Sequence, residues 1–332
     1  MKALVLAPFD GDALASLGAL APAVCEPWTE TRRLYDPQEL GERLEREGFG
    51  ILLIEADFAF EELFAAAPGL KLLGVCRNSL DHVDVEAATR HGALVAHTPG
   101  RNAQAVAEHT LGLMLALARH IPRADAYVKS GRWEDPVEPY TAMRGVELEG
   151  KTLGVIGLGA IGRRVARLAR GFGMSVLAYD PYLGAPGTRT RGATLASLDD
   201  LLRASDFVTL HVPASEETYG LLDSSRLAMM KPGSYLINTA SYAAVEEAAL
   251  LDALRSGRLA GAAFDIYESH PAPSSSPLLS MENVVLTPHI GGATRETIQR
   301  YSWAMVEEVR RFLSGARPRR LANPAAWRRR GG

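Results

Sequence analysis

The segment 152–162, TLGVIGLGAIG, decides the fold. Its apolar half, Thr152–Ile156, predicts a strand, and Gly157, Gly159 and Gly162 predict a tight turn into a helix over 163–172. The first glycine permits the turn, the second lets a pyrophosphate approach the backbone, and the third lets helix and strand pack closely. Because a second strand at 175–179 ends in an acid roughly 20 residues further on, we predict a dinucleotide-binding unit.

The acid at the end of this second strand, Asp180, indicates which dinucleotide binds. A carboxylate there accepts hydrogen bonds from the adenosine ribose hydroxyls and repels a 2′-phosphate, so NAD is favoured over NADP. Arg189 and Arg191 in the next loop would soften this preference if they reached the site. The alternative is a simple Asp-Pro turn after a strand. We expect phosphate binding at the helix N-terminus, through its free N–H groups and dipole, with Ala160 and Ile161 in the turn.

Short apolar runs alternate with helical patterns along the whole chain, which is typical of α/β proteins with doubly wound parallel sheets. The runs that we interpret as strands are 3–6, 51–54, 71–76, 94–96, 152–156, 175–179, 207–210, 235–238, 261–265 and 284–286.

Two long helical patterns connect the predicted sheets, one over about 102–120 and one over about 294–313. If the first carries the chain out of one domain and the second returns it, the outer domain is discontinuous. We therefore predict a flavodoxin-like domain at 1–100 and 293–332 and a Rossmann domain at 101–292. The arginine-rich segment 317–330 is predicted to be a solvated tail.

The composition favours small-molecule partners. The 332 residues carry a net charge of −3, which gives no global attraction to nucleic acid or to an anionic membrane. There is no signal-peptide pattern, no apolar stretch long enough to span a bilayer, and there are only two cysteines. We expect a cytoplasmic protein with free thiols. The histidines show no metal-ligand spacing, and we predict no metal site.

The residues that follow the predicted strands should meet in one crevice, because ligands bind outside the carboxyl ends of strands in such sheets. Several stretches here match one pattern together: 106–110 (VAEHT), the glycine turn, 205–213 (SDFVTLHVP), 230–233 (MKPG), 237–240 (INTA), 263–266 (AFDI) and 286–292 (LTPHIGG). From about residue 72 to 292 the sequence resembles the D-isomer-specific 2-hydroxyacid dehydrogenase family.

This resemblance implies two Rossmann-like domains, with an NAD-binding domain inserted in a discontinuous substrate domain, and a homodimer formed through the NAD domain. It implies reduction of 2-oxo acids by NADH. In the family a histidine exchanges a proton with the substrate oxygen, an arginine holds the carboxylate and polarises the carbonyl, and a glutamate keeps the histidine charged. The histidine position is His289. The cofactor contacts implied are Gly157, Gly159, Ala160, Ile161, Gly162, Asp180, His211, Val212, Pro213, Thr239, Ala240, Asp265, His289 and Gly291.

Two of the three catalytic positions depart from the family pattern. Ser241 stands at the arginine position, followed by Tyr242 instead of glycine, and His270 stands at the glutamate position. Without a carboxylate partner, His289 is expected to be mostly neutral at pH 7. The loss of an arginine that contacts charge in a dry site costs on the order of a hundred- to ten-thousandfold in rate. We therefore expect poor reduction of ordinary 2-oxo acids.

Two hypotheses explain these departures. In the first, Ser241, His270 and His289 serve a non-standard hydroxy or oxo substrate, and the loop Arg77-Asn78-Ser79 binds it through backbone amides and the Arg77 guanidinium. The related formate dehydrogenases carry a glutamine at the glutamate position, so a neutral partner is tolerated there. In the second, the chain is a non-catalytic NAD-binding regulator or scaffold, as in the corepressor branch related to the family.

Overall fold

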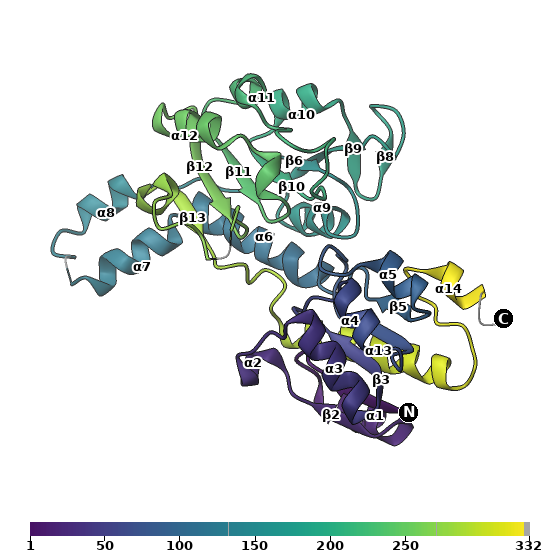
Figure 1. Ribbon diagram of the computed structural model, residues 1–332. Coiled ribbons are helices and arrows are strands. Elements are labelled where there is room, and N and C mark those ends of the chain that lie inside the picture. Colours follow the sequence, from purple (N-terminus) through teal and green to yellow (C-terminus); the bar gives the residue numbers. More distant parts are fainter. Residues whose placement is uncertain (132, 270, 329–332) are drawn as a thin grey trace. The chain divides into compact units, whose positions relative to one another are not determined.

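The computed structural model describes residues 1–131, 133–269 and 271–328. The chain divides into two compact units, Met1–Arg101 with Ala293–Gly332, and Asn102–Gly292. Each unit is built on its own parallel sheet, and the chain leaves the first unit and returns to it once (Figure 1). The protein is therefore α/β, with two doubly wound sheets.

The first unit has a five-stranded parallel sheet in the order β2-β1-β3-β4-β5. Its strands are β1 (Lys2–Val5), β2 (Ala23–Cys25), β3 (Phe49–Ile54), β4 (Leu72–Val75) and β5 (Leu94–His97). Its helices are α1 (Gly11–Leu20), α2 (Trp28–Thr31), α3 (Pro37–Glu47), α4 (Glu61–Ala66), α5 (Val85–Arg90), α13 (Arg295–Leu313) and α14 (Pro324–Arg328). Helices α3, α4 and α5 cover one face and α1 and α13 the other, so β3 is apolar along its whole length.

The C-terminal segment corrects one prediction. We expected 317–330 to be a solvated tail, but Leu321 pairs antiparallel with Ala96, at the β5 edge, and α14 follows. Buried Asn323 accepts a hydrogen bond from the backbone N–H of Val95 and donates to the carbonyl of Ala93 and the hydroxyl of Thr89. The prediction was wrong over 317–328 because it rested on the short length of the segment and its proline and glycine interruptions, and gave no weight to the apolar residues between the arginines.

The second unit has an eight-stranded sheet in the order β13-β12-β11-β10-β6-β7-β9-β8. Its strands are β6 (Thr152–Ile156), β7 (Ser175–Tyr179), β8 (Arg189–Thr190), β9 (Ala193–Leu195), β10 (Phe207–Leu210), β11 (Ser234–Asn238), β12 (Leu259–Phe264) and β13 (Val284–Leu286). All neighbours are parallel except β8 and β9. The strands β2, β8 and β9 were absent from the sequence prediction, since they are short strands at or beside sheet edges with little apolar patterning.

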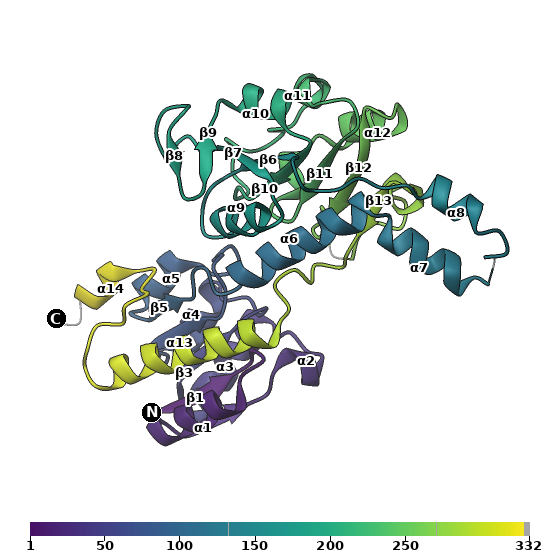
Figure 2. The same cartoon turned by 180° about the vertical axis from the view of Figure 1, so that it is seen from behind.

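Helices cover both faces of this second sheet (Figures 1 and 2). One core joins α6 and α9 to the sheet, and the other joins α10, α11 and α12 to it. The helices are α6 (Ala103–Ala118), α7 (Ile121–Lys129), α8 (Val137–Ala142), α9 (Gly162–Gly171), α10 (Leu198–Ala204), α11 (Ser224–Met229) and α12 (Glu247–Arg255), with short 3-10 turns η1 (Tyr242–Ala244) and η2 (Pro277–Ser280). Within the described ranges, no helix is both long and apolar enough to cross a bilayer.

Candidate active site

The glycine turn between β6 and α9 has the geometry of a phosphate cradle. Gly157 has φ +89°, which only glycine adopts without strain, and a methyl group at Gly162 would overlap the carbonyl oxygen of Gly157. A methyl group at Gly159 would meet no atom within 4 Å, so open space lies beside this position. The backbone N–H groups of residues 159–162 donate to no atom in the part of the chain that the structure describes. The turn therefore offers free donors at a helix N-terminus, which fits a pyrophosphate.

Asp180 lies at the end of β7 and is tied to this turn. Its Oδ2 accepts a hydrogen bond from the backbone N–H of Leu158 at 3.0 Å, and its Oδ1 accepts one from Tyr182 at 3.1 Å. The carboxylate is half-buried and held in one orientation beside the cradle. This is where an acid would accept hydrogen bonds from a ribose.

The segment His211-Val212-Pro213 follows β10 and borders the same turn. A side chain at Gly157 would collide with the His211 carbonyl and approach Val212, so the two segments are in close contact. The His211 ring shares a hydrogen bond with the Thr209 hydroxyl through Nε2, while its buried Nδ1 has no partner in the described residues. Burial lowers the pKa of His211 to about 3, so the ring is neutral at pH 7.

Asp265, after β12, anchors the loop 287–291 that carries His289. Its Oδ1 accepts hydrogen bonds from the Thr287 hydroxyl at 2.6 Å and the Ile290 N–H at 2.9 Å, and its Oδ2 accepts one from the Gly291 N–H at 2.7 Å. A methyl group at Gly291 would press on this carboxylate. Burial acts to raise the pKa of Asp265, but its hydrogen bonds outweigh burial and the pKa lies below its usual range.

His109, on α6, belongs to this anchor, and the sequence reasoning gave it no role. Its Nε2 lies 3.0 Å from the Thr287 hydroxyl and 3.4 Å from Oδ1 of Asp265. The motif at 106–110 that supported the family resemblance contains this histidine. Its helical position alone gave no sign that it would meet a strand end far along the chain.

His289 is exposed and has φ +56°, a left-handed backbone conformation that is strained for any residue other than glycine. Its backbone N–H donates to the Thr287 carbonyl at 3.0 Å. The same carbonyl accepts a hydrogen bond from the Tyr267 hydroxyl at 2.9 Å. The loop that carries His289 is therefore held from several sides.

The turn 238–241 follows β11, next to the strand that ends at Asp265. The Asn238 side chain accepts hydrogen bonds from the N–H groups of Ala240 and Ser241 and donates to the Ser241 carbonyl at 2.7 Å. Ser241 is extended and buried, and the Thr239 hydroxyl lies 3.2 Å from that of Thr110. Because β11, β12 and β13 are parallel neighbours, the turn 238–241, Asp265 and the loop 287–291 share one edge of the sheet.

The predicted substrate loop belongs to the first unit, where it follows β4. The carbonyl of Arg77 accepts the N–H of Thr98, the carbonyl of Asn78 lies 3.2 Å from Nδ1 of His97, and the Ser79 hydroxyl donates to Asp81 at 2.6 Å. The backbone N–H groups of residues 77–80 donate to no atom of the described chain. The loop therefore offers free backbone N–H groups and the Arg77 guanidinium, which suit an anion.

His270, which was predicted to stand at the glutamate position, lies outside the described residues. In the described ranges, no group of three or more histidine, cysteine, aspartate or glutamate side chains is arranged to hold a metal ion.

Comparison with known proteins identifies the family. Residues 111–291 match the model of the "D-isomer specific 2-hydroxyacid dehydrogenase, NAD binding domain". D-3-phosphoglycerate dehydrogenase of Archaeoglobus fulgidus is 41% identical over 262 residues, 79% of this chain and 49% of that protein. Glyoxylate reductase of Thermofilum pendens is 40% identical over 279 residues, 84% of this chain and 82% of that one. The crystal structure of the TT0316 protein from Thermus thermophilus covers 97% of this chain and 100% of its own, with 36% identity and a TM-score of 0.84.

The chain belongs to the D-isomer-specific 2-hydroxyacid dehydrogenase family, and the resemblance inferred from its motifs is confirmed. The match to the NAD binding domain also confirms NAD as the cofactor. The chain spans about half the length of the D-3-phosphoglycerate dehydrogenases that it matches.

Proposed function

We propose that the protein is an NAD-dependent oxidoreductase that transfers a hydride between the cofactor and a hydroxy or oxo acid, or a related non-standard carbonyl compound. The anchored loop 287–291 carries this proposal: a buried carboxylate with three hydrogen bonds fixes the backbone around His289. A binding protein gains little from holding one exposed histidine in a strained conformation, whereas proton transfer needs its donor in a fixed place.

In this proposal, different residues of the second unit bind different parts of the cofactor, and one residue transfers the proton. Gly157, Gly159, Ala160, Ile161 and Gly162 bind the pyrophosphate, and Asp180 binds the adenosine ribose. His211, Val212 and Pro213 form the wall beside the cofactor; Thr239, Ala240, Asp265 and Gly291 face the nicotinamide end. When bound, NAD accepts or donates the hydride. His289 takes the proton from a hydroxyl or gives it to a carbonyl oxygen.

Ser241 and His270 determine which substrate is accepted. A serine cannot clamp a carboxylate as a bidentate arginine does, so another cation must do so. Arg77 is our candidate, together with the free backbone amides of Asn78 and Ser79. Its guanidinium forms no hydrogen bond or ion pair with the described residues, so its charge is available to a ligand.

Oxidation of NADH by the purified protein tests this function over a panel of 2-oxo acids and ketones. We expect turnover with at least one member, and a rise in KM of about tenfold or more in Arg77→Gln without a change in the dissociation constant of NADH. Arg90→Gln is the control, since it removes an exposed arginine of the same unit that is paired with Glu61. Tight NADH binding without turnover on any compound would overturn the oxidoreductase proposal.

The second candidate is a non-catalytic NAD-binding regulator. The departures at Ser241 and His270 favour it, because they remove the carboxylate clamp and the counter-charge while the cofactor cradle is retained. If the protein is a regulator, NADH binding would change its stability or the partner that it binds. The protein would then show no substrate-dependent oxidation of NADH. The same panel distinguishes the two candidates.

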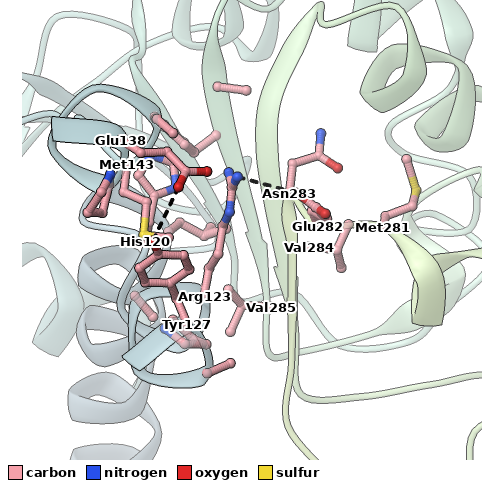
Figure 3. Close-up of a pocket in the computed structure, with 18 residues that line it drawn as sticks. His120, Arg123, Tyr127, Glu138, Met143, Met281, Glu282, Asn283, Val284 and Val285 are labelled. Carbon is pink, nitrogen blue, oxygen red and sulfur yellow. Dashed lines mark hydrogen bonds and ion pairs between the residues drawn. The ribbon is translucent and has the colours of Figure 1, made fainter. Parts of the chain in front are cut away.

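We also propose a homodimer formed through α7 and α8. Neither helix has a buried residue, and five large apolar side chains of this segment are exposed: Ile121, Val128, Trp133, Val137 and Tyr140. Beside them a groove of about 770 Å³ reaches the start of β12 and β13. Arg123 and Glu282 come from the two sides of this groove and form an ion pair (Figure 3), in which Nη2 of Arg123 lies 3.6 Å from Oε2 of Glu282. Since the segment carries both apolar and oppositely charged side chains, a second copy of itself is a suitable partner.

Sedimentation of the protein tests the dimer. We expect a dimer for the native chain and a monomer for the double variant Val137→Asp, Tyr140→Asp, because two charges cannot be buried in an apolar interface. Tyr219→Asp is the control, since Tyr219 is as exposed as Tyr140. A monomeric native chain would overturn the proposal.

We propose that the protein is located in the cytoplasm. Both cysteines are free, which suits a reducing compartment.

A further inference from the structure

A strained hairpin at the edge of the second sheet carries an arginine. Strands β8 and β9 pair antiparallel, and the turn between them is Arg191-Gly192, with φ +51° and +85°. Turns of this hand favour asparagine or glycine at both positions, because a side chain is strained there. Strain kept at one residue suggests that its side chain has a role.

The Arg191 side chain reaches the glycine turn. Its Nη1 donates a hydrogen bond to the carbonyl of Leu158 at 2.9 Å, and the N–H of the same leucine donates to Asp180 at 3.0 Å. The Arg191 guanidinium and the Asp180 carboxylate are therefore hydrogen-bonded to the carbonyl and to the N–H of the same residue, Leu158. Arg191 forms no ion pair with a carboxylate in the described ranges, and its Nε and Nη2 have no hydrogen-bond partner there.

A second arginine approaches the tip of the hairpin. The Nη1 of Arg170, on α9, lies 3.4 Å from where a side chain at Gly192 would begin. Two arginines therefore lie at the hairpin tip, and the Arg191 side chain extends from it to the glycine turn, where Asp180 supplies a negative charge. This arrangement differs from the one that the acid alone predicts, in which a phosphate on the ribose meets only a carboxylate.

NADH and NADPH differ only at the ribose 2′ position. A 2′-hydroxyl donates to a carboxylate, whereas a 2′-phosphate is repelled by it and needs a cation nearby. A guanidinium suits a phosphate because its planar donors bind two oxygens together. We propose that Arg191 receives the 2′-phosphate of NADPH, so that this protein binds NADPH as well as NADH in spite of Asp180.

Fluorescence titration of the purified protein with NADH and NADPH tests the proposal without any substrate. We expect the two dissociation constants of the native chain to differ by less than about tenfold. In Arg191→Gln, which keeps a donor for the Leu158 carbonyl but removes the charge, the NADPH constant should rise by about tenfold or more. The NADH constant should change by less than about twofold, within the usual effect of a surface substitution.

Two further variants separate charge from packing. Arg191→Lys keeps the charge without the planar geometry and should lose less NADPH affinity than Arg191→Gln. Arg189→Gln removes an exposed arginine from the same hairpin and should leave both constants unchanged. A thermal unfolding curve for each variant verifies that the fold is intact.

Either of two results would overturn the proposal. One is a native protein that binds NADPH more than about tenfold more weakly than NADH. The other is an equal loss of affinity for both cofactors in Arg191→Gln, which would mean that the arginine only holds the glycine turn. Neither result bears on the hydride-transfer proposal, which depends on His289 and its loop.

Discussion

The two halves of the second sheet's carboxyl edge can be compared directly. In the half formed by β6 and β7, backbone groups and glycines create the site, and every residue of the dinucleotide pattern is present. In the half formed by β11, β12 and β13, side chains create the site. There the anchor Asp265 is kept, but Ser241 and His270 stand where the family has charged residues.

This difference separates cofactor binding from the choice of reaction. A cradle made of backbone N–H groups depends on the fold and tolerates little change, because a side chain at Gly157 or Gly162 would collide with the backbone and one at Gly159 would fill the open space beside the turn. A reaction site made of side chains can change at single positions without disturbing the fold. A substitution in one half should therefore leave the property of the other half unchanged.

Gly162→Ala should have the largest effect, on the cofactor half. The added methyl group would overlap the carbonyl oxygen of Gly157, so β6 and α9 must separate. We expect the dissociation constant of NADH to rise by about a hundredfold and the free energy of unfolding to fall by about 2 kcal/mol. Gly171→Ala is the control in the same helix, since its methyl group meets no atom within 4 Å. NADH titration and urea unfolding measure both effects; an unaltered NADH constant in Gly162→Ala would refute the steric argument.

Asp265→Asn should act on the reaction half. The new amide nitrogen would face backbone N–H groups that need an acceptor, so the loop around His289 loses its anchor. We expect kcat to fall by about a hundredfold on any substrate found. Asp206→Asn is the control, because Asp206 also accepts a backbone N–H, that of Thr152, but at the opposite edge of the sheet. If both variants lose kcat equally, the anchor has no special role.

The native chain and Asp265→Asn should also differ in how their free energy of unfolding depends on pH. The folded-state pKa of Asp265 lies below its ordinary value of 3.8, so its contribution to stability is present above that value and is lost as the pH falls through the folded pKa. The native chain should therefore exceed Asp265→Asn in unfolding free energy at about pH 5, and by a smaller amount as the pH falls further. Urea unfolding at and below about pH 5 measures the difference. A gap that widened as the pH fell below about 5 would contradict the sign of the shift.

Asn323→Ala should leave both halves of the edge unaffected. It removes three hydrogen bonds that hold the C-terminal segment on β5, in the first unit. We expect a loss of about 2 kcal/mol in the free energy of unfolding, since buried backbone groups lose their partners. The NADH constant should remain that of the native chain, and a change in it would show that the two units are coupled.

The sequence predicted those parts of the molecule that depend on local pattern. The glycine turn, the acid after β7 and the alternation of strands and helices each follow from neighbouring residues, and the fold class was confirmed. Parts that depend on distant contacts were not predicted. His109 meets Asp265 only through the fold, Arg191 reaches Leu158 by the bend of a short hairpin, and the C-terminal segment pairs with β5.

We propose that positions 241 and 270, and not the cofactor half, limit the family's usual reaction in this chain. The double variant Ser241→Arg, His270→Glu tests this, with kcat/KM measured on a simple 2-oxo acid and the dissociation constant of NADH measured beside it. We predict a gain of about a hundredfold or more in kcat/KM with an unchanged NADH constant. No gain in a double variant that folds and binds NADH would contradict the claim.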